Sequence, residues 1–263
     1  MKIDLTQKIA LVTGGGTGIG RYIVKALSDA GAKVAFTSRS QKSINGTLKI
    51  LRNPKIHKGY RIDISKKNNV KKLYKLFKKD FGSIDILINN IGHTLNKKDP
   101  FSKIEDWRSV MNLNFFTSVD MVNKFIPEMK KKNWGRIINI TSVAGMEISG
   151  PSTFNASKAA LTAYTKSVGR ALALEKRNIV MTAVAPGIVN TEKGHWKNIL
   201  KKNPSHAKKY FKNRVPLGRF GTMNETTGII VFLSSDYASF FHSSIIHADG
   251  GHSKHYMSDT FFK

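Results

Sequence analysis

Three side chains in the middle of the chain have types and spacings that suit proton transfer at a carbonyl oxygen. Ser142 ends the apolar run GRIINITS, Lys158 lies sixteen residues later in FNASK, and Phe154 precedes the lysine by four positions. Residues four apart share one face of a helix, so a tyrosine at position 154 would lie beside the ammonium of Lys158. That ammonium would stabilise a phenolate, which otherwise forms only near pH 10. Phe154 itself has no hydroxyl and can neither give nor take a proton.

A glycine cluster near the start of the chain suits the binding of a pyrophosphate. Gly14, Gly18 and Gly20 in TGGGTGIG lie between an expected strand and an expected helix. At such a place, backbone amides at a helix N-terminus can approach a phosphate without obstruction by side chains. A glycine cluster alone could be an ordinary tight turn, but the strand-to-helix context favours a dinucleotide site.

Several motifs, in order along the chain, resemble those of the short-chain dehydrogenase/reductase family. The glycines match the family's TGxxxGxG, and Asn89, Asn90 and Gly92 match its NNAG with Ile91 in place of alanine. PGIVNT at 186–191 matches its PGxxxT, so the resemblance covers nearly the whole chain. It is nearest to 3-oxoacyl-carrier-protein reductases and to sugar or polyol dehydrogenases. The resemblance implies hydride transfer between a nicotinamide cofactor and a carbonyl or secondary alcohol.

The same resemblance implies roles for individual residues. Ser142 would hydrogen-bond the substrate oxygen, and Asn114 would continue a proton relay through water, with Asn112 as the competing candidate. Asn89 would support the sheet, and Thr191 would hold the nicotinamide carboxamide. The expected catalytic positions are Asn114, Ser142, Phe154 and Lys158. The expected cofactor-binding residues are Gly14, Thr17, Gly18, Ile19, Gly20, Ser38, Arg39, Asp63, Ile64, Asn90, Gly92, Lys158, Pro186, Gly187, Ile188 and Thr191.

Phe154 stands where the family has its catalytic tyrosine. Because phenylalanine keeps the ring and lacks one oxygen, we expect the fold and cofactor binding to survive and the rate to fall roughly 10²- to 10⁴-fold. Tyr164 lies on another helical face, and Asn155 offers no useful proton. A natural departure and an engineered Tyr-to-Phe change are both open, and the match at the other catalytic positions favours the engineered change. The function is therefore either that of a disabled or atypical reductase or that of a non-catalytic NADP-binding scaffold or sensor.

The end of the second expected strand indicates which dinucleotide binds. Family members that prefer NAD place an acid there, whereas this chain has Ser38 followed by Arg39. A carboxylate would repel a 2′-phosphate, and a guanidinium can pair with it through two hydrogen bonds. We therefore expect NADP(H) as the cofactor, with a merely solvated Arg39 as the alternative. Asp63, after the third expected strand, matches the family's acid that meets the adenine.

The elements that would position these residues alternate between short β-rich runs and helical stretches. Strands separated by helices run parallel with right-handed crossovers. This predicts an α/β fold, a doubly wound (Rossmann) seven-stranded parallel sheet with helices on both faces, in a single domain over 1–263. The expected strands are 8–14, 33–38, 56–63, 84–90, 135–141, 179–185 and 244–249. The expected helices are 18–30, 41–52, 67–80, 105–132, 153–176 and 223–235.

One long segment, 188–221, interrupts the alternation and is expected to be irregular. Loops of this length in compact domains are usually lids or binding loops. Between Lys193 and Arg219 it has no Asp or Glu, and it contains Trp196, Tyr210 and Phe211 among many basic residues. A basic aromatic lid favours a phosphorylated, carboxylated or carrier-bound substrate. A general lysine bias that extends into this loop is an equal alternative.

The charge of the whole chain is strongly positive, with 44 Lys and Arg against 17 Asp and Glu and a formal net charge of +27. Such a field attracts nucleic acid, anionic lipid or acidic substrates. At 66–79, however, the apolar side chains form a helical stripe and the lysines take the other directions, which is typical of a solvated surface. No nucleic-acid-binding module is recognised, so nucleic acid is not an expected partner.

Several observations bear on metal, membrane and compartment. Four histidines near the C-terminus are widely spaced and lack partner acids, so no metal site is expected. No apolar stretch reaches the roughly 18 residues that span a bilayer, and the chain begins in a strand-like run without a secretory signal. The absence of cysteine fits a reducing compartment. We expect a cytoplasmic protein that forms a homotetramer or homodimer, since the family commonly assembles through the helices that match 105–132 and 153–176.

Overall fold

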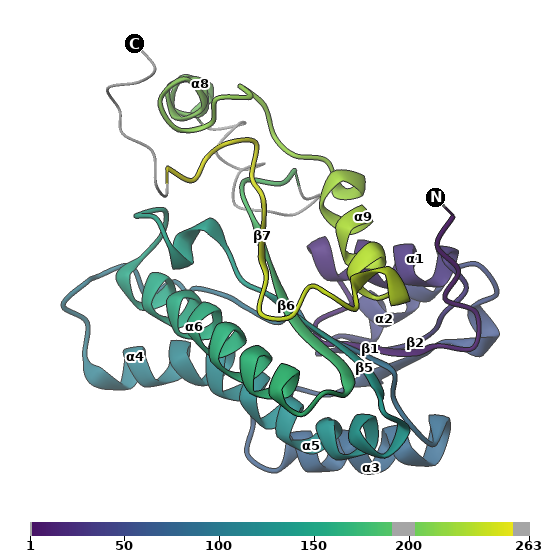
Figure 1. The fold of residues 1–263 in the computed structure, drawn as a ribbon. Coiled ribbons are helices and arrows are strands. Elements are labelled where there is room, and N and C mark those ends of the chain that lie inside the picture. The colour runs from purple at the N-terminus through teal and green to yellow at the C-terminus, as the bar shows by residue number, and fades with distance from the viewer. Residues whose placement is uncertain (1, 191–202, 255–263) are drawn as a thin grey trace.

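Seven short runs, most of them rich in β-branched and other apolar residues, form one parallel sheet in the computed structural model, which describes residues 2–190 and 203–254. The strands are β1 Ile9–Val12, β2 Lys33–Ser38, β3 Lys58–Arg61, β4 Ile86–Asn89, β5 Trp134–Ile140, β6 Asn178–Pro186 and β7 Ile245–Ala248. Their order across the sheet is β3-β2-β1-β4-β5-β6-β7, and every neighbouring pair is parallel. The prediction of a doubly wound, seven-stranded parallel sheet is confirmed (Figure 1).

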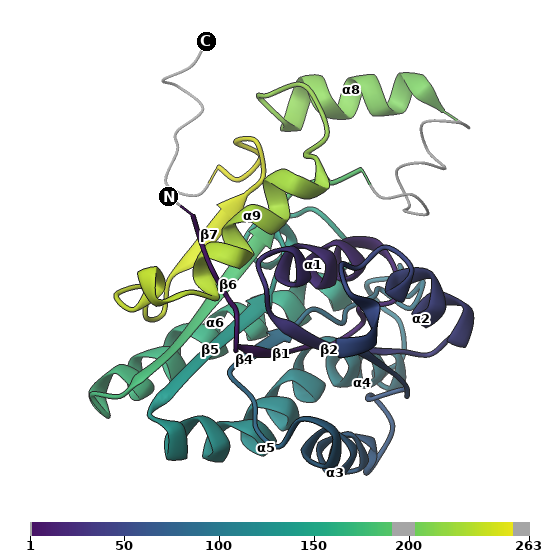
Figure 2. The ribbon, with the colours of Figure 1, turned by 90° about the vertical axis from the view of Figure 1, so that its right-hand side faces the viewer.

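Helices cover both faces of the sheet, as Figure 2 shows. They are α1 Gly18–Asp29, α2 Gln41–Leu48, α3 Asn69–Phe81, α4 Ile104–Met111, α5 Thr117–Lys132, α6 Ser152–Leu174, α8 Pro204–Arg214 and α9 Met223–Leu233. In β1, Ala10 and Val12 pack with α1 and α9, and Leu11 packs with α3 and α5 on the opposite face. Successive side chains of a strand point to opposite faces, so a sheet covered on both sides requires apolar residues throughout its strands.

The helices differ from the expected ones in three places. The helix expected over 41–52 ends at Leu48. The stretch 105–132 is interrupted by a π-helical segment, Asn112–Phe116, between α4 and α5. The prediction that 188–221 is irregular was wrong for 204–214, because Pro204–Arg214 forms α8. Proline before a run of residues without β-branching favours a helix start, a signal that the basic composition of the segment obscured.

The topology brings the functional motifs to one edge. From β1 the chain adds β2 and β3 on one side, then returns to place β4 on the other side of β1. In parallel sheets, ligands bind at the carboxyl ends of the strands near such a switch point. The glycine-rich loop follows β1, the NNIG motif ends β4, Ser142 follows β5, and Gly187 follows β6. None of the helices within 2–190 and 203–254 is both long and apolar enough to cross a membrane.

Candidate active site

Lys158 lies at the centre of the candidate site, on the first half of α6. Its side chain is almost fully buried, and its Nζ donates a hydrogen bond of 2.7 Å to the carbonyl oxygen of Ile140 at the end of β5. Burial lowers the pKa of Lys158 to about 8, because the charged form loses its hydration. The ammonium group of Lys158 is therefore held in one position, and its charge can change within a physiological pH range.

Asn114 reaches the same place from the π-helical segment. Its amide is fully buried, with Oδ1 accepting from the backbone amide of His93 at 2.8 Å and Nδ2 donating to the carbonyl oxygens of His93 and Val110. Helical segments of this kind are frequent at functional sites because they turn a side chain out of the regular register. Asn112, the competing candidate, is exposed and instead donates to the carbonyl oxygen of Ser65.

Gly92 explains how Lys158 and Asn114 can approach each other. A Cβ at this position would lie 2.9 Å from Oδ1 of Asn114 and 3.0 Å from Nζ of Lys158. The last residue of the NNIG motif therefore has to be glycine for both side chains to occupy the same corner. The geometry places Asn114, Lys158 and the end of β4 together, as the motif spacing predicts.

Ser142 follows β5 and begins a short 3₁₀ turn over Val143–Gly145. Its hydroxyl oxygen accepts a hydrogen bond of 3.1 Å from the amide of Ala144, which fixes the side chain. Within the described chain this hydroxyl has no recorded acceptor, so its hydrogen can point toward a substrate oxygen. Ser142 is half-buried and lies at the edge where the strands end.

Phe154 lies one helical turn before Lys158 on α6. The ammonium nitrogen lies 5.7 Å from the centre of the half-buried phenyl ring, a separation at which a cation and an aromatic face attract each other weakly. The ring thus lies next to the ammonium of Lys158. Tyr164 does not replace it, because its ring packs edge-on against Phe115 and burial raises the pKa of its phenol to about 12.

Several glycines of the loop after β1 lie where a side chain would not fit. Gly14 and Gly18 have φ values of 69° and 55°, in the left-handed region that glycine adopts most easily. A Cβ on Gly20 would lie 2.3 Å from the carbonyl oxygen of Gly14, and one on Gly16 would lie 2.4 Å from Oγ of Ser38. By contrast, a Cβ on Gly18 would meet nothing within 4 Å. The loop therefore has free space at Gly18, at the N-terminus of α1, where a phosphate could approach.

Other expected cofactor-binding residues border this loop. Thr17 is exposed at the N-cap of α1, and Ile19 is half-buried in its first turn. Arg39 is exposed directly after β2, and no hydrogen bond or ion pair is recorded for its side chain among the described residues. Asp63 accepts hydrogen bonds from the amide and hydroxyl of Ser65, which orients its carboxylate after β3. Ile64 beside it is buried.

Asn89 and Asn90 fasten β4 to its neighbours in different directions. Asn89 donates to Oδ1 of Asn139 on β5 at 2.9 Å, and Asn139 donates in turn to Thr165 on α6. Asn90 donates through Nδ2 to the carbonyl oxygen of Thr13 at 2.9 Å, where β1 passes into the glycine-rich loop. The first asparagine thus supports the sheet, and the second fixes the position of the loop.

Backbone hydrogen bonds hold the two ends of the segment after β6 in place. Gly187 donates to the carbonyl oxygen of Ala248 on β7, and a Cβ there would lie 2.7 Å from Cα of Asp249. Gly221 donates to the carbonyl oxygen of Ile188 at 2.9 Å, so the two ends of the segment 188–221 lie side by side. Pro186 ends β6 opposite Ala248. Thr191 lies outside the described residues.

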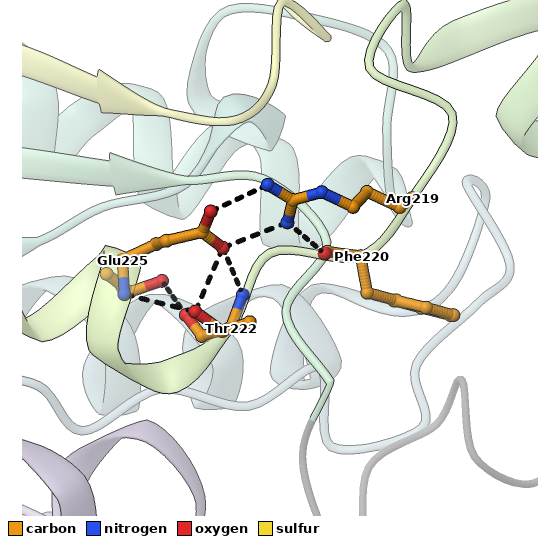
Figure 3. Close-up of polar contacts among 5 residues, drawn as sticks. Arg219, Phe220, Thr222 and Glu225 are labelled. Carbon is orange, nitrogen blue, oxygen red and sulfur yellow. Dashed lines mark hydrogen bonds and ion pairs between the residues drawn. The ribbon is translucent and has the colours of Figure 1, made fainter.

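Polar contacts fix the far end of this segment to α9, as Figure 3 shows. Arg219 donates two hydrogen bonds to the carboxylate of Glu225, at 3.0 and 2.7 Å. Thr222 and Glu225 form a capping box, in which each side chain bonds the other residue's backbone amide at the start of α9. These contacts hold the pKa of Glu225 well below its usual range.

α8 contacts the segment that leads from Ser142 to Phe154. Arg214 donates to the carbonyl oxygen of Ile148 at 2.7 Å, and the ring of Tyr210 packs edge-on against His252. Lys208, Lys209, Lys212 and Arg214 are all exposed on this helix. A basic helix therefore lies beside the candidate site, although the first half of the expected lid is outside the described residues.

Residues 8–200 match the family described as short chain dehydrogenase. The chain belongs to the short-chain dehydrogenase/reductase family. It is 33% identical over 255 residues to the 3-oxoacyl-[acyl-carrier-protein] reductase FabG of Aquifex aeolicus (strain VF5), covering 95% of this chain and 99% of that protein. It is 36% identical over 248 residues to the corresponding protein of Buchnera aphidicola subsp. Baizongia pistaciae (strain Bp), covering 94% and 97%.

A solved short-chain structure has the same fold. The Pseudomonas aeruginosa RhlG/NADP active-site complex matches with a TM-score of 0.85 and 26% identity, covering 95% of this chain and 98% of that one. Family membership makes the chain an oxidoreductase by descent and supports a nicotinamide cofactor at the glycine-rich edge. Within this short-chain dehydrogenase, five residues with structural roles at that edge were missed: Thr13, Gly15, Gly16, Arg21 and Thr47. Only Gly15 and Gly16 had a signal in the sequence, namely the run of three glycines.

Proposed function

We propose that this chain is an NADP(H)-dependent oxidoreductase that is disabled or atypical at its proton-transfer step. The observation that carries the proposal is the convergence of Lys158 and Asn114 on Gly92, with the Phe154 ring one turn from the ammonium. The surroundings of a catalytic phenol are present, and only its oxygen is missing.

In the proposed reaction, bound NADP(H) would supply or accept the hydride at a carbonyl or secondary alcohol carbon. Amides of the glycine-rich loop would hold the pyrophosphate, and Ser142 would donate a hydrogen bond to the reacting oxygen. A phenol at position 154 would give its proton to that oxygen, and Lys158 would stabilise the resulting phenolate. In this chain the proton has no donor at position 154, so carbonyl reduction should be slow.

Three observations support NADP(H) rather than NAD(H). No acid ends β2, Arg39 is exposed next to Ser38, and Gly16 packs directly against the Ser38 hydroxyl. A 2′-phosphate at this point would meet a guanidinium and would meet no carboxylate at the strand end. The solved relative in complex with NADP supports the same choice.

The substrate of this proposed reaction is an anionic or carrier-bound carbonyl compound. Its support is the exposed basic surface of α8 next to the loop after Ser142, together with the similarity to two 3-oxoacyl-[acyl-carrier-protein] reductases. In this proposal 188–221 acts as the substrate lid of a single domain. Its two ends lie side by side, joined by a hydrogen bond of 2.9 Å from Gly221 to the carbonyl oxygen of Ile188.

The proposed assembly is a homotetramer or homodimer through α4, α5 and α6. Large apolar side chains are exposed on these elements and on the π-helical segment, namely Ile104, Phe116 and Leu174. These exposed apolar side chains support a surface that a second copy covers.

The rival proposal is a non-catalytic NADP-binding scaffold or sensor, favoured by Phe154 and by the packing of Tyr164 away from the site. The variant Phe154→Tyr separates the two. If the relay is intact, NADPH oxidation that depends on a carbonyl should rise by roughly 10²-fold or more. The panel should include 3-oxoacyl thioesters, aldehydes and sugars. The added activity should disappear when Ser142→Ala is combined with Phe154→Tyr.

A folded Phe154→Tyr variant that binds NADPH and stays inert across the panel would support the scaffold.

Cofactor choice is tested by titration of NADPH and NADH against the wild-type chain and Arg39→Ala. NADPH should bind more tightly to the wild type, and the difference should shrink by about tenfold in the variant, as loss of a charge-assisted hydrogen bond predicts. Equal affinities in the wild type would refute NADP(H) preference.

A further inference from the structure

Two side chains outside the recognised motifs hold the glycine-rich loop from behind. Arg21, in the first turn of α1, donates to the carbonyl oxygen of Gly16 from Nη2 at 2.8 Å and from Nε at 3.2 Å. Its Nε also lies 3.2 Å from the hydroxyl of Thr47 on α2. Thr47 is fully buried, and its hydroxyl lies 3.1 Å from the carbonyl oxygen of Gly15 and 3.3 Å from that of Gly16.

These contacts determine the direction of the loop's amides. In a trans peptide the C=O bond and the following N–H bond point in opposite directions. Because the carbonyl of Gly15 points toward Thr47, the amide of Gly16 turns away from α2. Because the carbonyl of Gly16 points toward Arg21, the amide of Thr17 turns away from Arg21. Within the described chain, no hydrogen bond is recorded from the amides of residues 15–20.

The start of α1, next to these amides, has open space beside it. Thr17 is exposed, and a Cβ on Gly18 would meet nothing within 4 Å. Backbone amides that are unbonded and directed into open space at a helix N-terminus are suited to an anion such as a pyrophosphate. Arg21 and Thr47 thus orient the donors without having to touch the ligand themselves.

A glycine in α2 gives independent support to a role of Arg21 in orienting the loop. Gly46 lies inside an eight-residue helix, where glycine is less favourable than alanine. A Cβ at Gly46 would lie 3.3 Å from Nη2 of Arg21, closer than such contacts normally are. Gly46 therefore weakens α2 but leaves space for the guanidinium of Arg21.

We propose that Arg21 and Thr47 are positioning residues that orient the amides of Gly16 and Thr17 toward the pyrophosphate of a dinucleotide. This inference rests on the proposed function, since it assumes that a dinucleotide binds at the loop. The planar guanidinium supplies Nε and Nη2 to one carbonyl at a fixed angle, which the point-like ammonium of a lysine cannot reproduce.

The test compares Arg21→Met with Arg39→Ala in binding titrations of three ligands. Arg21→Met keeps the apolar stem and removes the donors, so the dissociation constants of NADPH and NADH should rise by the same factor, about 10- to 100-fold. Adenosine 2′-monophosphate has the 2′-phosphate but no pyrophosphate, and its binding should change less than about twofold by the same reasoning. Arg39→Ala should show the opposite pattern, with NADPH and adenosine 2′-monophosphate weakened and NADH spared.

Further variants separate orientation of the loop from stability of the fold. Thr47→Val should weaken both dinucleotides, and Thr47→Ser, which keeps the hydroxyl, should restore binding. Gly46→Ala should leave the melting temperature equal or higher, because alanine favours the helix, while NADPH binding weakens several-fold. A loss of affinity without a loss of stability is not expected from a purely structural role.

Two outcomes would overturn the inference alone. One is NADPH binding by folded Arg21→Met and Thr47→Val as tight as in the wild type. The other is an equal loss of affinity for NADPH and adenosine 2′-monophosphate, which would indicate general damage. If the wild-type chain binds neither NADPH nor NADH, the proposed function fails, and this inference fails with it.

Discussion

The loop after β1 and the segment from Ser142 to Lys158 lie at the same edge of the sheet but are built in different ways. The loop is made of backbone, and a side chain at Gly16 or Gly20 would overlap atoms already in place. The proposed reacting centre is made of side-chain groups, namely the Lys158 ammonium, the Ser142 hydroxyl and the Asn114 amide.

This difference determines how each region responds to change. A backbone site fails when atoms are added, because the chain has to move to accommodate them. A side-chain site can lose its chemistry through the removal of one atom while the fold remains, which is what we propose for Phe154. The packing of the Phe154 ring beside Lys158 shows that the surrounding structure accepts a ring without the oxygen.

The largest effect should come from adding a methyl group to the backbone site. In Gly20→Ala the new Cβ would lie 2.3 Å from the carbonyl oxygen of Gly14 and 2.5 Å from Nδ2 of Asn90. Since a backbone oxygen cannot yield easily, we expect NADPH affinity to fall about 100-fold and the free energy of unfolding to fall by about 1–3 kcal/mol. Fluorescence titration and chemical denaturation measure the two effects.

Gly228→Ala is the matched control for that change. Gly228 is exposed within α9, and a Cβ there would meet nothing within 4 Å. Because alanine favours a helix over glycine, this variant should gain about 0.5–1 kcal/mol of stability and leave NADPH binding unchanged. Normal NADPH binding by Gly20→Ala would show that the loop tolerates side chains and would remove the contrast between the two regions.

The next effect concerns pH in the side-chain site once a phenol is present. Burial lowers the pKa of Lys158 to about 8, so its charge is present below that pH and lost above it. In Phe154→Tyr, carbonyl reduction should therefore decline as pH rises through about 8, by up to tenfold per pH unit. A profile of kcat/KM from pH 6 to 10 measures this decline. A flat profile would mean that the ammonium is not needed for the reaction.

The sequence predicted the fold well, because apolar runs of strand length alternate with helices of clear period along most of the chain. The motifs also placed Gly92, Asn114, Ser142 and Lys158 at one edge, and the structure brings Gly92, Asn114 and Lys158 into one corner. The π-helical turn at Asn112–Phe116 had no signal of its own, since π and α turns share the same residue preferences. Arg21 and Thr47 were not recognised because their partners are backbone carbonyls, which no side-chain pattern reveals.

A smaller effect tests the cost of holding a cation in the reacting centre. Lys158 is almost fully buried, so Lys158→Met should raise the free energy of unfolding at pH 7 by about 1–3 kcal/mol, even though Ile140 loses a donor. Because the folded-state pKa is depressed, wild-type stability should rise between pH 8 and the unfolded value near 10.5, and the variant should lack this rise. Lys166→Met, exposed on the same helix, should change stability by less than about 0.5 kcal/mol. A destabilised Lys158→Met would contradict the expected cost of the buried cation.

The smallest effect concerns His57, a buried titratable group directly before β3. Its Nδ1 accepts from the amide of Val34 at 3.0 Å, which requires a neutral ring, and burial lowers the pKa of the imidazole. Below about pH 6.5 the unfolded chain takes up a proton that the folded ring does not, so stability should fall with falling pH, by at most about 1.4 kcal/mol per unit. His57→Gln should be less stable at pH 7 but should show a flatter dependence between pH 7 and 5. An unchanged slope in His57→Gln would assign the acid sensitivity to the carboxylates, and His57 would then be a packing residue only.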